Sequence, residues 1–145
     1  MREILEKNRQ QFEIIEVNNG KEAMTYLQSA LQHGALPCLI ILDINMPVMD
    51  GKETLKQIKN QEAFQSVPVV VFTTSDSELD RMFCKKLGTE MITKPTSFTS
   101  LETTVVKLLK FCKWKWFTSG MAIQRGFHNY PRPPFFLPAG LQQYP

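Results

Sequence analysis

The chain has 145 residues, of which 43% are hydrophobic and 21% charged, and this length and composition are typical of one soluble globular domain. No apolar run approaches membrane-spanning length, and charged residues interrupt the first twenty, so we expect neither a membrane span nor a signal peptide. The three cysteines and two histidines lack metal-ligand spacing. We therefore expect idle thiols in a reducing cytoplasm and no metal site built on these side chains.

The formal net charge of +3 is unevenly distributed. All 14 acidic residues lie at or before Glu102, whereas four of the 17 basic residues follow Cys112. Residues 1–112 therefore carry 13 − 14 = −1 and residues 113–145 carry +4. Four basic residues in this aromatic and proline-rich tail are too sparse for a nucleic-acid contact, so we expect no nucleic-acid partner.

Helical and strand patterns alternate along residues 1–112, which form the predicted domain. Apolar spacing predicts helices over 1–9, 21–33, 52–60, 77–87 and 98–111, and strands over 12–17, 38–42, 67–72 and 91–93. Ser75 and Glu78 fit a capping box that opens the fourth helix. Such alternation predicts an α/β fold with a parallel sheet. Residues 113–145 have no periodicity, so we expect an irregular or disordered tail.

The strand 38–42 organises the chain, because its apolar residues have no polar interruption and suit a strand buried on both faces. It stops at Asp43, a proline follows at Pro47, and Asp50-Gly51 reads as a turn. A carboxylate at the end of a strand is often only a turn former or a helix cap. Two later strands favour a functional interpretation instead.

The strand 67–72 ends at Thr73, and the strand 91–93 ends at Lys94. Open α/β sheets bind ligands at the carboxyl ends of their strands, so we expect Asp43, Thr73 and Lys94 to share one edge. A carboxylate can attack a phosphoryl group, while a hydroxyl and an ammonium hold the phosphoryl oxygens. Lys94 could alternatively be a surface lysine before a turn proline.

These motifs and their spacing resemble the receiver domain of two-component response regulators. The matching residues are Asp43, Met46-Pro47, Met49-Asp50-Gly51, Pro68, Phe72-Thr73, Gly88 and Lys94-Pro95, and the tract 94–98 resembles small single-domain regulators related to those paired with bacterial phytochromes. The resemblance implies a flavodoxin-like doubly wound parallel sheet of strand order 2-1-3-4-5. It also implies a phosphoryl group accepted on Asp43 from a histidine kinase or phosphotransfer protein. Mg²⁺ would be held by Asp43 and the Asn45 carbonyl.

The chain departs from this family at its start, where we expect a strand ending in two acidic residues before the helix 1–9 to be missing. Those carboxylates would hold the metal, so we expect Mg²⁺ binding to be weakened or lost. We interpret this as an N-terminally truncated receiver, the alternative being a true pseudo-receiver that no longer binds metal well. A second departure is Met91, where many members have an aromatic switch residue. We expect Met91 either to pack as an ordinary strand residue or to make a looser switch.

The missing strand would leave a gap between the strands 12–17 and 38–42. These strands could pair directly, an edge could stay open and recruit another chain, or part of the tail could fill the gap. We favour direct pairing, with four strands, a poorly ordered helix 1–9, lowered stability and a tendency to self-associate.

Two functions remain from the sequence. The first is a phosphorelay receiver that presents the helix 77–87 and the last helix to an unknown downstream protein. The alternative is a phosphorylation-independent interaction module, a pseudo-receiver. A hydrolase with an aspartyl intermediate would need a second positioned acid or base, so we do not expect an enzyme. No output domain is visible, so we do not expect a DNA-binding regulator.

Overall fold

The computed structural model describes residues 13–112 and 134–138. The helices and strands are, in chain order, β1 (Glu13–Val17), α2 (Gly20–Gln32), β2 (Leu39–Leu42), α3 (Gly51–Asn60), the 3₁₀ helix η1 (Glu62–Phe64), β3 (Val69–Thr73), α4 (Glu78–Lys86), β4 (Glu90–Thr93), α5 (Phe98–Leu109) and β5 (Pro134–Pro138). The predicted helix 1–9 lies outside the described residues. None of the described helices has the length and apolar character needed to cross a membrane.

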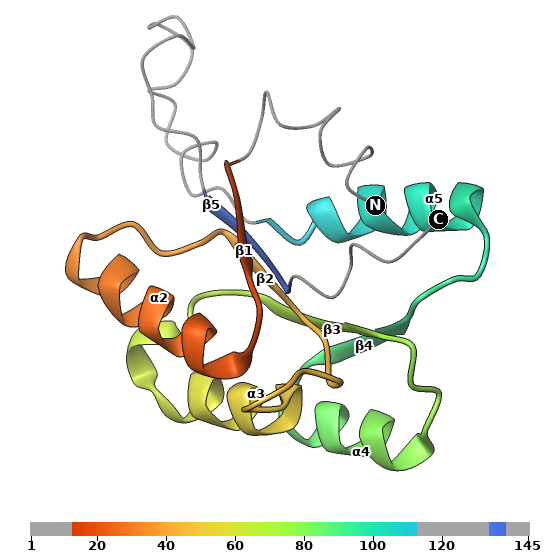
Figure 1. Cartoon of the computed structure of the whole chain (residues 1–145), viewed down its shortest axis with the longest axis horizontal. Coiled ribbons are helices and arrows are strands. Elements are labelled where there is room, and N and C mark those ends of the chain that lie inside the picture. Colours follow the sequence, from red (N-terminus) through yellow and green to blue (C-terminus); the bar gives the residue numbers. More distant parts are fainter. Residues whose placement is uncertain (1–12, 113–133, 139–145) are drawn as a thin grey trace, which may run out of the picture.

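The described strands form one parallel sheet in the order β1-β5-β2-β3-β4 (Figure 1). This is the flavodoxin-like order predicted from the sequence, with β5 in the position of the first strand. β5 pairs with all five residues of β1 and, on its other side, with Leu39 and Ile40 of β2. The preferred prediction of direct pairing between β1 and β2 is therefore wrong, as is the prediction that 134–138 is irregular. The weighed alternative, in which part of the tail fills the gap, is the one observed.

A physical reason for this outcome lies in the backbone of the two flanking strands. Directly pairing β1 with β2 would satisfy one edge of each strand, whereas an inserted strand adds a ladder on both sides of itself. β5 is short and begins and ends with Pro134 and Pro138, which have no N–H to donate. β5 therefore begins and ends at residues that cannot donate an N–H hydrogen bond to a neighbouring strand.

Helices cover both faces of the sheet and give two apolar cores. In Figure 1, α2, α3 and α4 lie on one face and α5 lies on the other. Alternate residues of each strand face the two layers, so Ile40 and Leu42 join the first core, whereas Leu39 and Ile41 join the second. The helical members of the first core are Ala23, Met24, Leu27, Leu55, Ile58, Phe64 and Cys84, and those of the second are Leu101, Val105 and Leu108.

Most helix predictions hold, with local differences. Asn19 caps α2, Asp50 caps α3 and Ser97 caps α5, each through its side chain. Leu31, in the last turn of α2, is 37% exposed. The short helix η1 was not predicted, although its Phe64 is fully buried.

The prediction of three idle thiols is also wrong in part. Cys38 and Cys112 form a disulfide, with their Cα atoms 4.9 Å apart, whereas Cys84 is a free, buried thiol. The two cysteines are 74 residues apart in sequence, so their spacing gave no sign of the bond. The fold brings the end of α5 beside the start of β2, which places these side chains together.

Candidate functional site

The site lies at the carboxyl edge of the sheet, where Asp43 follows the last residue of β2. Asp43 is 6% exposed, and Lys94, which follows β4, is 8% exposed. The Lys94 Nζ atom donates a hydrogen bond to Asp43 Oδ2 at 2.5 Å. Two residues that are 51 positions apart therefore form a buried ion pair.

The surroundings of this ion pair leave each partner with few other contacts. Asp43 Oδ1 accepts a hydrogen bond from the backbone N–H of Asn45 at 3.0 Å. The Lys94 ammonium also lies 5.9 Å from the centre of the Phe72 ring, within the range of a cation–π contact. A buried ion pair of this kind is stable only while both charges remain, because removing one leaves the other desolvated and unpaired.

Thr73 is the last residue of β3 and is fully buried. Its backbone carbonyl accepts a hydrogen bond from the Lys94 N–H at 2.7 Å, so the ends of β3 and β4 are held together. Its hydroxyl oxygen accepts a hydrogen bond from the Ser75 N–H at 3.2 Å. Because a hydroxyl can accept and donate at once, the Thr73 hydroxyl hydrogen remains available to a further acceptor.

The loop between Asp43 and α3 is tightly turned. Val48 has a φ of 65°, and the Met49 N–H donates to the Pro47 carbonyl at 2.7 Å across it. This is a γ-turn of the strained kind, and a β-branched residue at positive φ adds to the strain. Gly51 ends the loop, and its N–H donates to the Ile44 carbonyl at 3.0 Å. The loop therefore folds back so that α3 starts directly against the backbone of the site.

A divalent cation is poorly matched by the described residues around Asp43. One Asp43 oxygen is bonded to the Lys94 ammonium and the other to an N–H donor. Within the described part of the chain, no group of three or more His, Cys, Asp or Glu side chains is placed to hold a metal ion. Mg²⁺ prefers several oxygen ligands in octahedral geometry, which this set does not supply. Asn45 is exposed and contributes its N–H to Asp43.

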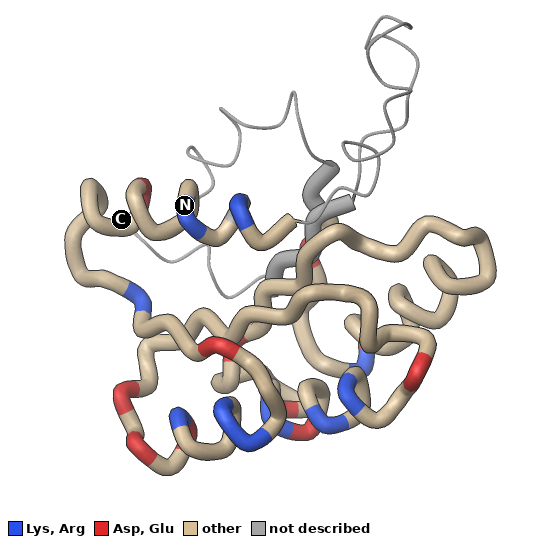
Figure 2. Tube along the Cα trace, turned by 180° about the vertical axis from the view of Figure 1, so that it is seen from behind, with Lys and Arg blue, Asp and Glu red and all other residues tan. Residues whose placement is uncertain are grey.

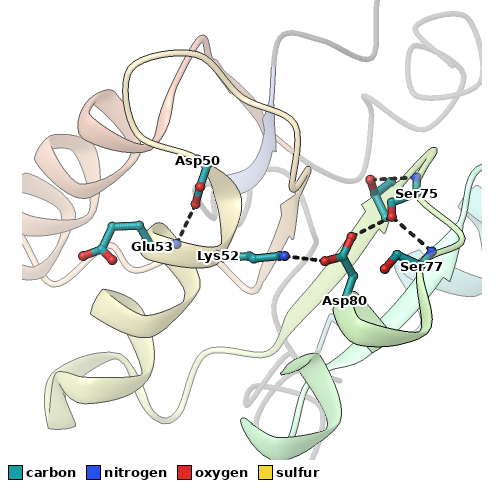
Figure 3. Close-up of polar contacts among 7 residues, drawn as sticks. Asp50, Lys52, Glu53, Ser75, Ser77 and Asp80 are labelled. Carbon is teal, nitrogen blue, oxygen red and sulfur yellow. Dashed lines mark hydrogen bonds and ion pairs between the residues drawn. The ribbon is translucent and has the colours of Figure 1, made fainter. Parts of the chain in front are cut away.

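Sequence reasoning missed a second polar cluster beside the site. Asp80 of α4 forms an ion pair with Lys52 of α3 and accepts a hydrogen bond from Ser75 Oγ at 2.6 Å (Figure 3). The predicted capping box is wrong, because the N-cap of α4 is Ser77, which makes no side-chain cap bond. The Ser75 side chain instead binds Asp80, five residues later. The Ser-x-x-Glu pattern predicted a contact between Ser75 and Glu78 and gave no indication of the contact between Ser75 and Asp80.

The comparisons with known proteins agree with this geometry. A family model described as the response regulator receiver domain matches residues 1–106. The chain is 38% identical over 98 residues to the probable methanogenesis regulatory protein FilR2 of Methanothrix harundinacea, covering 66% of this chain and 63% of that protein. It is 38% identical over 82 residues to the response regulator Rcp1 of Synechocystis, covering 55% of this chain and 56% of that protein. The chain thus spans less than two thirds of the length of these curated relatives.

Solved structures give the same relationship. The phosphorylated cyanobacterial phytochrome response regulator RcpA superposes with a TM-score of 0.63 and 35% identity, over 68% of this chain and 72% of that chain. The Mn²⁺-bound form of response regulator Rcp1 superposes with a TM-score of 0.61 and 32% identity, over 72% and 75%. The family model covers well over half of the chain, and the sheet carries the acid, hydroxyl and lysine at one edge. The chain belongs to the response regulator receiver domain family of two-component systems.

Proposed function

We propose that this receiver domain takes part in phosphorelay signalling by accepting a phosphoryl group on Asp43 from a histidine kinase or a phosphotransfer protein. The observation that carries the proposal is the buried Asp43–Lys94 ion pair at the carboxyl edge of the sheet. An ionised carboxylate is the nucleophile that the reaction needs, and the ammonium beside it can later pair with phosphoryl oxygens.

The proposed step forms one bond and breaks one bond. A carboxylate oxygen of Asp43 attacks the phosphorus of a phosphohistidine, and the P–N bond breaks with its electron pair moving to the imidazole, which takes up a proton. Lys94 then neutralises charge on the transferred group, and the Thr73 hydroxyl donates to a second oxygen. The chain turns over no separate substrate in this scheme, so it acts as a signalling protein rather than as an enzyme.

The described part of the chain supplies few ligands for the metal ion that would assist the proposed reaction. Mg²⁺ supplies charge neutralisation to phosphoryl transfer when it is bound. Asp43 and the Asn45 carbonyl are the protein oxygens proposed to contact it here, and further oxygens would have to come from water and phosphate. We therefore propose that the chain binds Mg²⁺ weakly or not at all.

The proposed output surface lies on α4 and α5, which flank the edge strand β4 on its two faces (Figure 1). Both helices expose large apolar side chains, namely Leu79 and Met82 on α4 and Phe98 and Val106 on α5. Leu79 is 77% exposed, which favours burial against another protein. We propose a downstream protein partner in the cytoplasm, with self-association as a further use of exposed apolar surface.

The decisive test is transfer from a small phosphodonor, followed by intact-protein mass spectrometry across a range of Mg²⁺ concentrations. We expect the chain to gain one phosphoryl group slowly, and Asp43→Asn to gain none. The matched control is Asp76→Asn, because Asp76 is an exposed carboxylate on the nearby loop before α4. Labelling that persists in Asp43→Asn contradicts the assignment of Asp43.

Lys94 provides the second arm of this experiment. Lys94→Ala removes the ammonium that pairs with the phosphoryl oxygens, so we expect labelling to slow by about 100-fold. It also leaves the buried Asp43 without its ion-pair partner, so we expect a less stable protein that still folds. Lys21→Ala, at an exposed position of α2, should leave labelling unchanged. A Lys94→Ala protein that fails to fold would indicate a structural role for Lys94 instead.

The second candidate function is a phosphorylation-independent interaction module with the same fold. It is favoured by the incomplete set of metal ligands among the described residues. Under this alternative, no phosphodonor labels Asp43 at any Mg²⁺ concentration, while binding of a partner to α4 and α5 is the same for wild type and Asp43→Asn.

A further inference from the structure

Asp80 joins helix α3 to the loop that leaves the end of β3. It lies in the first turn of α4, and its side chain is 12% exposed. One carboxylate oxygen forms an ion pair with the Lys52 ammonium, and the other accepts from Ser75 Oγ at 2.6 Å (Figure 3). Lys52 follows directly on the loop that begins at Asp43, and Ser75 lies two residues after Thr73. A single side chain thus contacts both α3 and the loop after β3.

The hydrogen bonds continue from Ser75 to the Thr73 hydroxyl. The Ser75 N–H donates to Thr73 Oγ1 at 3.2 Å, and the Ser77 N–H donates to Ser75 Oγ at 3.3 Å. The Ser75 hydroxyl therefore donates to Asp80 and accepts from the Ser77 N–H, while the Ser75 N–H donates to the Thr73 hydroxyl. The buried Thr73 hydroxyl is thus linked to Asp80 through Ser75.

The charges of the cluster are mutually stabilised. Lys52 and then Ser75 hold the pKa of Asp80 below its ordinary value, and Asp80 raises the pKa of Lys52. The Lys52 ammonium also lies 5.9 Å from the centre of the Phe83 ring on α4. Both oxygens of Asp80 have partners, so the carboxylate is fixed in direction as well as in charge.

A simple helix-capping role does not account for these contacts. A capping side chain would accept hydrogen bonds from the free N–H groups in the first turn of α4. The N-cap residue of α4 is Ser77, and its side chain makes no such bond. Asp80 instead uses both oxygens on side chains that belong to other segments, α3 and the loop after β3. The arrangement resembles the outer groups that orient a reacting side chain in other sites.

We propose that Asp80 is a positioning residue of the receiver reaction, which holds the Thr73 hydroxyl in place relative to Asp43 by clamping α3 to the loop after β3 through Lys52 and Ser75. This inference rests on the proposed phosphorylation of Asp43 and adds a residue that does not itself touch the phosphoryl group. Loss of the clamp lets the Thr73 hydroxyl move away from the position in which it donates to a phosphoryl oxygen, and small misplacements of this kind slow reactions strongly.

The first test uses the unphosphorylated protein and does not depend on phosphoryl transfer. Asp80→Asn keeps the shape of the side chain but loses the charge that binds Lys52, and Ser75→Ala removes the other arm while the Lys52–Asp80 pair remains. In both variants we expect NMR couplings of the Thr73 side chain to show averaging over rotamers, and the Ser75 amide to exchange faster. Glu78→Gln is the control, because Glu78 is exposed on the same turn of α4 and, among the described residues, its carboxylate forms an ion pair only with Arg81, at 3.8 Å.

The second test measures labelling of Asp43 by the small phosphodonor. We expect Asp80→Asn and Ser75→Ala to slow labelling by about 10-fold, Lys52→Met to do the same, and Lys52→Arg to restore most of the rate. Effects of Asp80→Asn and Lys52→Met should not add in the double variant, because both break one ion pair.

The outcomes separate this inference from the proposed function. An unchanged Thr73 side chain in both Asp80→Asn and Ser75→Ala overturns the clamp. A disturbed Thr73 with wild-type labelling shows that Asp80 is structural and overturns its positioning role. A wild-type chain that is never labelled overturns the proposed function, and with it the role of Asp80 in that reaction, whereas the Thr73 couplings still decide whether the clamp exists.

Discussion

Gly51 has no room for a side chain, because a Cβ atom there would collide with the carbonyl oxygen of Asp43 and the Cα atom of Ile44. This close approach explains why the loop from Asp43 can turn directly into α3. The Asp50-Gly51 pair therefore has two separate tasks, since the Asp50 side chain caps α3 by accepting from the Glu53 N–H at 2.9 Å. The sequence indicated a turn here, but the contact with the site is visible only in the fold.

Replacing Gly51 tests this contact. Gly51→Ala forces Asp43 and its neighbours to shift, so we expect the free energy of unfolding to fall by about 1–3 kcal/mol. Labelling of Asp43 should fall as well, because the carboxylate moves away from Lys94. Urea denaturation measures the first effect, and Asn60→Ala, at the exposed last residue of α3, should stay within about 0.5 kcal/mol of wild type. A fully stable Gly51→Ala protein would contradict the described packing.

The residues that could be predicted for the site are those that end strands. Asp43, Thr73 and Lys94 each follow an apolar run, and the parallel sheet brings such positions to one edge. The structure joins Asp43 to Lys94 directly, while the proposed roles of all three stay predictions. Asp80 could not be found in this way, because its partner Lys52 lies on another helix and nothing in sequence spacing marks contacts between helices.

The contact between α3 and α4 combines a polar and an aromatic part. Besides the Lys52–Asp80 pair, the ammonium groups of Lys52 and Lys56 lie 5.9 and 5.7 Å from the centre of the Phe83 ring. Beneath them, burial raises the pKa of the Cys84 thiol, with a smaller contribution from Asp80. Figure 2 shows that charged residues gather along these outer helices and loops, whereas the strands in the middle of the sheet have few.

Stability should depend on pH through this pair. The lowered pKa of Asp80 means that its contribution is present above the ordinary value of 3.8 and is lost as the pH falls through the lowered value. The raised pKa of Lys52 means that its contribution is present below 10.5 and is lost as the pH rises through the raised value. We expect the difference in urea midpoint between wild type and Asp80→Asn to be constant near neutral pH and to shrink at both extremes.

The matched control for this pH series is Asp76→Asn, since Asp76 is exposed and forms no part of the cluster. A difference between wild type and Asp80→Asn that persists undiminished below the lowered pKa would mean that shape, rather than charge, stabilises the contact between α3 and α4.

The whole molecule depends on β5 for the continuity of its sheet. The flavodoxin-like order was predicted from alternating patterns, because each element has its own local signal. The source of the strand between β1 and β2 could not be predicted with the same rules. Residues 134–138 begin and end with prolines and are too few for a period-2 pattern to stand out. Their place is set by the two strands that they join.

Removal of β5 tests this dependence by hydrogen exchange. Deleting residues 134–145 should speed exchange at Ile15 to Val17 by at least about 100-fold, because β1 loses the pairing that the described sheet gives it. Exchange in β2 should remain slower, since β2 still pairs with β3. Deleting residues 139–145 alone is the matched control, because it leaves β5 in the chain.

The deletion also distinguishes the other ways of closing the sheet. Slow exchange at β1 in a monomer lacking β5 would support direct pairing of β1 with β2. Slow exchange that appears only in a dimer would mean that an open edge has recruited a second chain.

The position of β5 in the sequence also bears on how the protein is made. A ribosome adds about 5–20 residues per second, so the 138 − 17 = 121 residues between the end of β1 and the end of β5 take roughly 6–24 s to synthesise. During that interval the nascent chain already contains β2, β3 and β4, which can pair, while β1 waits without its neighbour. β1 is therefore synthesised before the other described strands, but it obtains its pairing partner β5 last. A chaperone that shields unpaired strand edges would have to cover the edge of β1 for longer than the edges of the other strands.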